Sequence, residues 1–210
     1  LVGGGAMAGA RVASRSPRPS LRRRRAAAAP PPRASSSSPG EGVWKTGVRE
    51  AAPNAKKKSR EYFAFDLGGS SPHSEQVVCP DDSELVCVTV DRPLGLYFEE
   101  KQHWGEQVTY VDEVVEGSNA EAAGVKAGDI LRITTAVFGV RAPADMATMF
   151  GGNPNKMVVA KAVFVADGQP YGKCMTALVS NNEQVDTKEG GKADVPSISL
   201  VFERPTPVAV

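Results

Sequence analysis

The stretch from Glu84 to Thr135 constrains the fold most, because short apolar segments alternate with turns along it. Its first segment, Leu85 to Val90, has valine at every second position, and side chains two apart in a strand point to the same face. Three valines on one face favour a strand with a buried side. Pro93 ends the segment, because proline has no N–H for a sheet and forces an extended backbone on the residue before it.

A second strand is predicted directly after this turn, over Leu94 to Phe98. Leu94, Leu96 and Phe98 share one face of it, and Gly95 lets another backbone approach closely. We therefore expect a hydrophobic pocket beside backbone N–H groups that remain open.

The rest of the stretch predicts two strands separated by a short helix. A polar loop over 99–107 precedes a strand over 108–115, and residues 116–119 favour a turn. Ser118 or Asn119 can cap a helix over 120–123, which Gly124 ends by adopting a left-handed conformation. A tight turn over 126–129 then leads to a fourth strand over 130–137.

Two motifs in this order resemble those of PDZ domains. The first is Pro-Leu-Gly-Leu at 93–96, which is similar to the carboxylate-binding loop of that family, and the second is GSNAEAAGVKAGDIL at 117–131. The segment TTAVFG at 134–139 also resembles plastid PDZ proteins of plants and green algae. The resemblance implies an α+β fold: a PDZ-like, partly open, five- to six-stranded antiparallel β-barrel or sandwich capped by two helices.

This PDZ-like domain is expected to extend over residues 84–204, with a C-terminal tail at 205–210. The apolar segment 157–166 is predicted to be an additional strand, inserted between the fourth strand and the second helix. Residues 169–181 are predicted to form that helix, because Tyr171, Met175 and Leu178 share one helical face. An alternative places the helix beside the groove at 144–150. A polar loop over 184–195 precedes a closing strand over 197–204.

The resemblance also implies a mode of binding, in which a partner's carboxyl terminus adds a strand beside the second strand. Its carboxylate would bind to the loop formed by Arg92, Leu94, Gly95 and Leu96. Its side chains would enter a groove lined by Phe98, Tyr171, Met175 and Leu178. Tyr171 stands where many members of the family have histidine, so an apolar ligand residue is expected opposite it.

Residues 1–55 have the composition of an organelle transit peptide and are expected to be disordered. The first 40 residues contain eight arginines and seven serines but no Asp or Glu. Five prolines between 17 and 32 would interrupt the amphipathic helix of a mitochondrial signal, so the chloroplast is favoured over the mitochondrion. Cleavage is expected between Ala26 and Ala55, and residues 56–83 are interpreted as a linker.

The charge is distributed unevenly along the chain. Residues 1–60 have fourteen Lys or Arg against two acids, a balance of +12, whereas residues 61–210 have eleven against twenty-two, a balance of −11. An acidic domain repels phosphate backbones, which argues against a nucleic acid as the main ligand. No segment has the ~18–20 apolar residues that a transmembrane helix needs.

The sequence predicts no enzymatic activity, no metal site and no cofactor. Its two histidines, His73 and His103, are expected to be solvated, in a loop and at a hairpin tip. Gly-x-Ser-x-Gly and His-Glu-x-x-His motifs are absent from the sequence. Its three cysteines lack the spacing of metal ligands and fit reduced thiols, with a redox-regulated bridge between two of them as an open alternative: Cys79, Cys87 and Cys174.

The expected function is a protein–protein interaction module, acting as an adaptor or assembly factor at the stromal face of the thylakoid. The alternative is the substrate-recognition part of a plastid PDZ protease, whose protease domain would need more chain than residues 1–83 supply. The last residues, Val208, Ala209 and Val210, form an apolar terminus that the groove of the same or another copy could accept.

Overall fold

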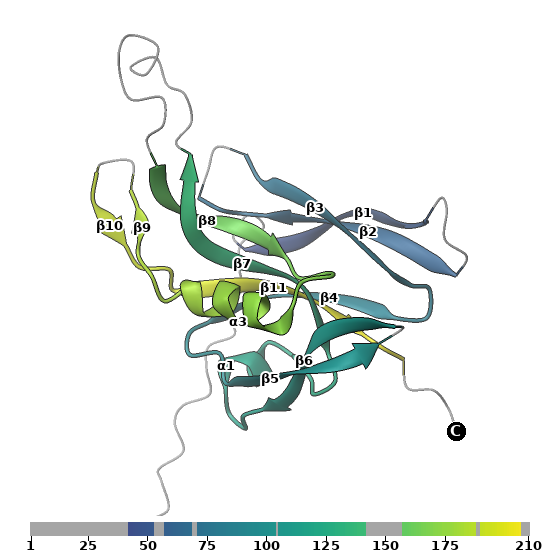
Figure 1. The fold of residues 1–210 in the computed structure, drawn as a ribbon. Coiled ribbons are helices and arrows are strands. Elements are labelled where there is room, and N and C mark those ends of the chain that lie inside the picture. Colours follow the sequence, from purple (N-terminus) through teal and green to yellow (C-terminus); the bar gives the residue numbers. More distant parts are fainter. Residues whose placement is uncertain are drawn as a thin grey trace, which may run out of the picture. The chain divides into compact units, whose positions relative to one another are not determined.

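The computed structural model describes residues 42–52, 57–68, 71–103, 105–141, 157–187 and 190–206 (Figure 1). These residues form a β-rich α+β fold with two helices, and the strand pairings within them are antiparallel. The α+β class predicted from the sequence is therefore confirmed.

The larger sheet has six strands. Its path is β4 (Glu84–Asp91), β11 (Ser197–Arg204), β7 (Ile130–Arg141), β6 (Glu106–Val114) and β5 (Leu96–His103), and β8 (Met157–Val165) pairs with β7. Within the described residues β4 and β5 are the two ends of this path, so the sheet is open and does not close into a barrel. The additional strand predicted over 157–166 is confirmed as β8.

Two helices lie on one face of this sheet. Helix α1 (Asn119–Ala122) begins after Ser118, whose hydroxyl accepts a hydrogen bond from Glu121 N at 3.2 Å, so Ser118 is the cap. Helix α3 (Tyr171–Ser180) confirms the helix predicted over 169–181. The alternative helix at 144–150 lies outside the described residues.

One hydrophobic core fills the space between the sheet and these helices. Alternate residues of β4 and β11 point into it, as the period of two in a strand requires. The three residues that the sequence placed on one helical face of α3 pack together there, and Ala120 of α1 is buried in the same core. Its strand residues include Val88, Val90, Phe98, Val111, Leu131, Ile198, Leu200 and Phe202.

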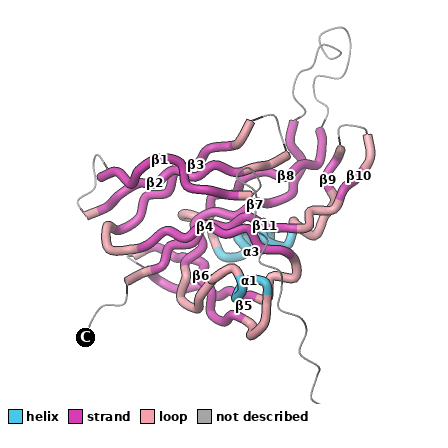
Figure 2. Tube along the Cα trace, turned by 180° about the vertical axis from the view of Figure 1, so that it is seen from behind, coloured by secondary structure: helices cyan, strands magenta, loops and turns pink. Residues whose placement is uncertain are grey.

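The opposite face of the larger sheet is covered as well. β1 (Val43–Ala51), β2 (Lys58–Phe65) and β3 (His73–Pro80) form a three-stranded sheet beside it (Figure 2). Residues of both sheets form a second core: Phe63, Phe65, Val77, Cys79, Leu85, Ile133 and Val201.

The linker predicted over 56–83 is therefore wrong, and the disorder predicted up to residue 55 is wrong for β1. The physical reason is that Phe63 and Phe65 are fully buried against the larger sheet, which gives β2 and its neighbours a hydrophobic surface to cover. Hydrogen bonds add to this packing, because Val43 N donates to Thr89 Oγ1 of β4 at 3.2 Å.

Two segments that the sequence predicted as polar loops contain strands. β5 continues to His103 and β6 begins at Glu106, so residues 99–103 and 106–107 belong to two paired strands. Within 184–195, β9 (Val185–Asp186) pairs with β10 (Lys192–Ala193). The predicted docking of Val208, Ala209 and Val210 lies outside the described residues.

If the two sheets unfold as one unit, Phe63→Ala will lower the free energy of unfolding by about 3–5 kcal/mol, the cost of deleting a buried phenyl ring. Urea unfolding followed by tryptophan fluorescence and circular dichroism measures this loss. Val48→Ala is the matched control on the same sheet, because Val48 is 81% exposed and its truncation should stay within about 0.5 kcal/mol. An early separate transition for the Phe63 variant would show instead that the small sheet unfolds alone.

Candidate functional site

A side chain of α1 bonds to two carbonyl groups at the loop between β4 and β5. Asn119 Nδ2 donates to Asp91 O at 3.0 Å and to Pro93 O at 3.1 Å. One amide group thus fixes the carbonyl before the turn and the carbonyl within it. The peptide bond between Arg92 and Pro93 is cis.

The next two carbonyl groups of the loop also accept hydrogen bonds, from α1 and from the residue after β6. Ala120 N, in the first turn of α1, donates to Leu94 O at 3.0 Å, and Val115 N donates to Gly95 O at 2.9 Å. Three consecutive carbonyls, those of residues 93–95, therefore face α1 and the end of β6.

This arrangement turns three N–H groups the other way. In a planar trans peptide the N–H points opposite to the carbonyl of the preceding residue. The amides of Leu94, Gly95 and Leu96 are therefore directed away from α1. In the described part of the chain, Leu94 N and Gly95 N donate to no protein acceptor. Successive amides on one side of a turn form a concave site that favours anions.

Gly95 is required by this geometry for two reasons. Its φ is +73°, which L side chains rarely adopt. A Cβ at this position would also overlap the side chain of Ser118, the cap of α1. The sequence predicted the close approach of another backbone at Gly95, whereas the group that lies closest to this position is the side chain of Ser118.

The other wall of the site is α3, whose C-terminal end is fixed to β7. The side chain of Asn181 is buried, and its Nδ2 donates to Thr135 O at 2.7 Å. Ser180 Oγ accepts from Val137 N at 2.9 Å. These bonds hold the end of the helix against the sheet.

Between the loop and this end of α3 lies an open cavity of about 450 Å³. That volume falls within the range of small-ligand sites. Its lining is mostly apolar and comes from the loop, from the start of β5, from α3 and from β11: Arg92, Pro93, Leu94, Leu96, Phe98, Met175, Leu178, Val179, Asn182 and Ile198.

Arg92 places a positive charge at this cavity. Its Nη1 donates to Asn182 Oδ1 at 2.8 Å, which links the loop to the second residue after the end of α3. Its buried Nε has no hydrogen-bond partner in the described protein. The guanidinium thus brings a positive charge to this edge of the cavity, and a carboxylate is a group that a guanidinium binds strongly.

The structure brings most of the predicted site residues together. Six of the eight line the cavity, and Gly95 shapes the loop beside it. Tyr171 lies apart from the lining, because its hydroxyl donates to Phe98 O across the space between α3 and β5, at 2.7 Å.

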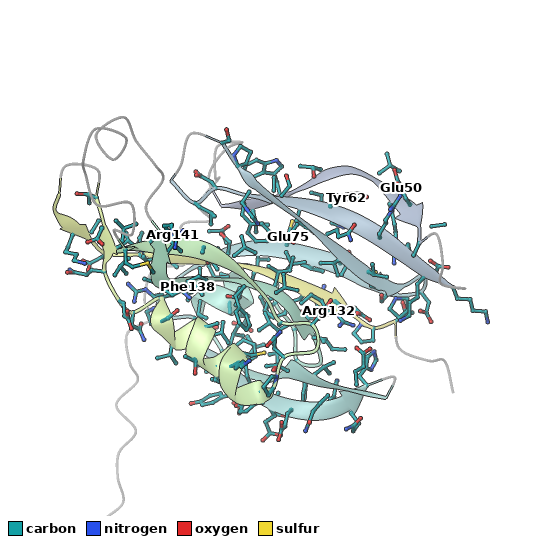
Figure 3. All side chains as sticks on the ribbon, turned by 45° about the horizontal axis from the view of Figure 1, so that its top comes forward. Glu50, Tyr62, Glu75, Arg132, Phe138 and Arg141 are labelled. Atoms are coloured by element: carbon teal, nitrogen blue, oxygen red, sulfur yellow. The ribbon has the colours of Figure 1, made fainter. Side chains whose placement is uncertain are left out.

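A second cavity, of about 400 Å³, is polar and lies near the β5–β6 hairpin. Arg132 of β7, labelled in Figure 3, is buried there between Glu203 and Asp167, and its Nη1 lies 2.9 Å from Asp167 Oδ1. Burial raises the pKa of Asp167, although Arg132 opposes the shift. The two acids together satisfy the guanidinium, so the arrangement is that of a buried ion-pair network.

His103 belongs to this network, which corrects the prediction that it is solvated. Its side chain is 20% exposed, and its Nε2 lies 3.8 Å from Glu203 Oε1. Burial lowers the pKa of His103, although Glu203 opposes the shift. His73 lies at the start of β3, with Nε2 2.8 Å from Glu75 Oε1.

The cysteines and acids of the described chain form no bridge or metal cluster. Cys79, Cys87 and Cys174 are free thiols, and burial raises the pKa of each of them. Groups of three or more His, Cys, Asp or Glu arranged to hold a metal are absent from the described residues. Neither of the two helices is long and apolar enough to cross a membrane.

Two functional contacts of the site were missed by the sequence reasoning, those of Asn119 and Asn182. Asn119 was considered only as a helix cap, yet its side chain holds the loop. The signal was present, since Ser118 and Asn119 are both capping residues and one helix needs only one of them. For Asn182 the sequence contains no such signal.

Gly95→Ala should destabilise the loop more than Gly117→Ala does. Gly117 has nearly the same φ, +74°, but a Cβ there meets no atom within 4 Å. Both variants carry the strain of a left-handed alanine, about 1–2 kcal/mol, and only the first adds overlap with Ser118, about 1–3 kcal/mol more.

The Ser118→Gly background separates the two effects in a double-mutant cycle. Ser118→Gly alone should cost a few tenths of a kcal/mol as a cap replacement. In that background the additional loss at Gly95 should largely disappear when thermal unfolding is compared. An unchanged loss would mean that Ser118 is not the group that excludes a side chain at this position.

Comparison with known proteins assigns the chain to no family. No protein-family model matches it, no curated protein matches it, and no solved structure matches it. The candidate site is therefore defined by its own geometry: three outward amides, one arginine and an apolar cavity beside an edge strand.

Proposed function

We propose that the chain is a peptide-binding module of the PDZ type, which binds the carboxyl terminus of a partner protein beside β5. The observation that supports this most is the loop over 93–96. Three of its amides point away from α1 because the carbonyls before them are already bonded. A terminal carboxylate is the peptide group that needs several N–H donors at one point.

The charge and the cavity of the site fit the same ligand. Arg92, which lines the cavity, brings a positive charge to the carboxylate. The cavity below it is lined by Leu94, Leu96 and Leu178, which suits an apolar last side chain. A ligand of this kind would supply hydrogen-bond acceptors to the amides and would cover the apolar surface of the cavity.

Strand addition requires an edge strand, and β5 is one. It is the last strand in the path of the larger sheet, and β6 is its pairing partner in the described residues. A bound carboxyl terminus would continue the antiparallel pairing at the start of β5, in the space between that strand and α3.

The composition of the N-terminal 40 residues supports a plastid location, and the role that follows is that of a stromal adaptor or assembly factor. Because β1 begins at Val43 and pairs with β2, import cleavage would have to fall before Gly42 to leave the small sheet intact. This narrows the cleavage region expected from the sequence.

Fluorescence anisotropy with labelled hexapeptides ending in valine tests the proposal. Peptides with a free carboxylate should bind with a Kd of roughly 1 μM, about −8 kcal/mol. Amidation of the terminus should weaken binding at least about tenfold, or ~1.4 kcal/mol, because the amide has no charge for Arg92 and the loop. Equal binding of free and amidated peptides would rule out carboxylate recognition at this loop.

Arg92→Ala should weaken binding of the free peptide about fivefold, roughly 1 kcal/mol for a charge-assisted hydrogen bond at a partly solvated site. The loss should shrink as salt is added, because exposed charges are screened. Arg60→Ala is the matched control, since Arg60 forms an ion pair with Glu50 on the small sheet, 2.8 Å apart, and lines neither cavity. An equal loss in both variants would point to net charge rather than to a specific contact.

A further inference from the structure

The hydroxyl of Tyr171 occupies a hydrogen-bond acceptor that an added strand would need. Tyr171 is the first residue of α3, and its hydroxyl donates to Phe98 O of β5 at 2.7 Å. Because this carbonyl bonds to α3, it faces away from β6 and towards the open side of the edge strand. The ring packs against the core between the sheet and the helices, so the side chain spans the space between α3 and β5.

The backbone of β5 determines where this contact falls along a ligand. Gly95 O is bonded to β6 through Val115 N, so Leu96 N–H points outward, and Leu96 O shares that direction. Two residues later, the backbone carbonyl of Phe98 points outward again, as its bond to Tyr171 shows. An antiparallel ligand whose last residue pairs with Leu96 would thus place its third-from-last residue opposite Phe98.

We propose that Tyr171 limits recognition to the last two residues of a partner's carboxyl terminus. This proposal rests on the proposed function and specifies which part of the ligand is read. The carboxylate of the last residue binds to the loop amides, its side chain enters the apolar cavity, and its N–H donates to Leu96 O. The Tyr171 hydroxyl lies 2.7 Å from Phe98 O on the side from which the N–H of the third-from-last residue would approach, so that N–H can reach the carbonyl only by displacing the hydroxyl and breaking its bond. The exchange brings no net gain in affinity.

The cavity ends before Tyr171, as recognition of only the last two residues requires. Its lining comes from the loop, the start of β5, β11 and the part of α3 from Met175 onward, with Met175, Leu178 and Val179 from the helix. Tyr171, one turn before Met175, is outside that lining. The site is therefore open at the end where the carboxylate binds and bridged at the end where a longer peptide would continue.

Backbone ester analogues of one hexapeptide test the proposal in the 210-residue chain. An ester at a chosen position replaces one N–H by oxygen and removes a single donor. The first analogue removes the N–H of the last residue, which faces Leu96 O, and the second removes that of the third-from-last residue, which faces Phe98 O. Binding of the parent peptide and both analogues is measured for the wild type, Tyr171→Phe and Tyr97→Phe.

In the wild type the second analogue should bind within about twofold of the parent peptide, whereas the first should bind roughly two- to tenfold more weakly, as expected for one lost neutral hydrogen bond. In Tyr171→Phe the carbonyl of Phe98 is free, so the second analogue should also lose roughly two- to tenfold. Tyr97→Phe is the matched control, since Tyr97 is 60% exposed on the same strand and should behave as the wild type.

A loss of affinity for the second analogue in the wild type would overturn the proposal, because it would show that the ligand displaces Tyr171. Failure of the parent peptide to bind at all would instead contradict the proposed function. If Tyr171→Phe does not fold, the two analogues in the wild type decide the question by themselves.

Discussion

The structure depends on the burial of both faces of the central strands. β4, β11 and β7 carry apolar side chains towards α1 and α3 on one face and towards the small sheet on the other. β11 illustrates this, because Leu200 and Phe202 face the helices while Val201 between them faces Phe63 and Phe65. A strand with two buried faces can shift by one residue only by exchanging the two cores, so its register is firmly set.

This fixed register positions the candidate site. The loop over 91–95 begins where β4 ends, and α3 is attached by Asn181 to β7, two strands away from β4 in the sheet. The loop and the helix therefore form the two walls of a cavity whose width is set by the sheet between them. Asn119 completes the arrangement, because it fixes the loop carbonyls and so determines which way the amides point.

Much of the larger sheet was predictable, because its strands alternate clearly and its turns contain glycine and proline. The small sheet was not, since β2 and β3 each bury few large apolar side chains, among them Phe63, Phe65 and Val77. A different signal was present on the partner strands. Leu85 and Val201 are apolar on the face that the alternation assigns to solvent, and strands buried on both faces show such continuous apolar runs.

At the site, the residue types were predictable and the contacts were not. The sequence indicated Gly95 and the leucines around it, because their roles follow from backbone freedom and hydrophobicity. It assigned Tyr171 to the groove but could not show that its hydroxyl reaches Phe98 O, 73 residues earlier in the chain. Every residue has a backbone carbonyl, whatever its type. The sequence therefore does not mark which carbonyl a side chain will bond to.

In the proposed function, the Tyr171 contact would also explain how β5 could accept a ligand without pairing with other chains along its whole length. An exposed edge strand tends to pair with other chains, and charged residues or covering side chains prevent this. β5 has both, since Glu99, Glu100 and Lys101 follow the carbonyl that Tyr171 covers. Only the start of the strand, at Leu96, combines uncovered backbone groups with an apolar cavity. Under the proposed function, a ligand would therefore have to present an end rather than a continuous strand, and a carboxyl terminus that places its charge on the loop amides would meet that requirement.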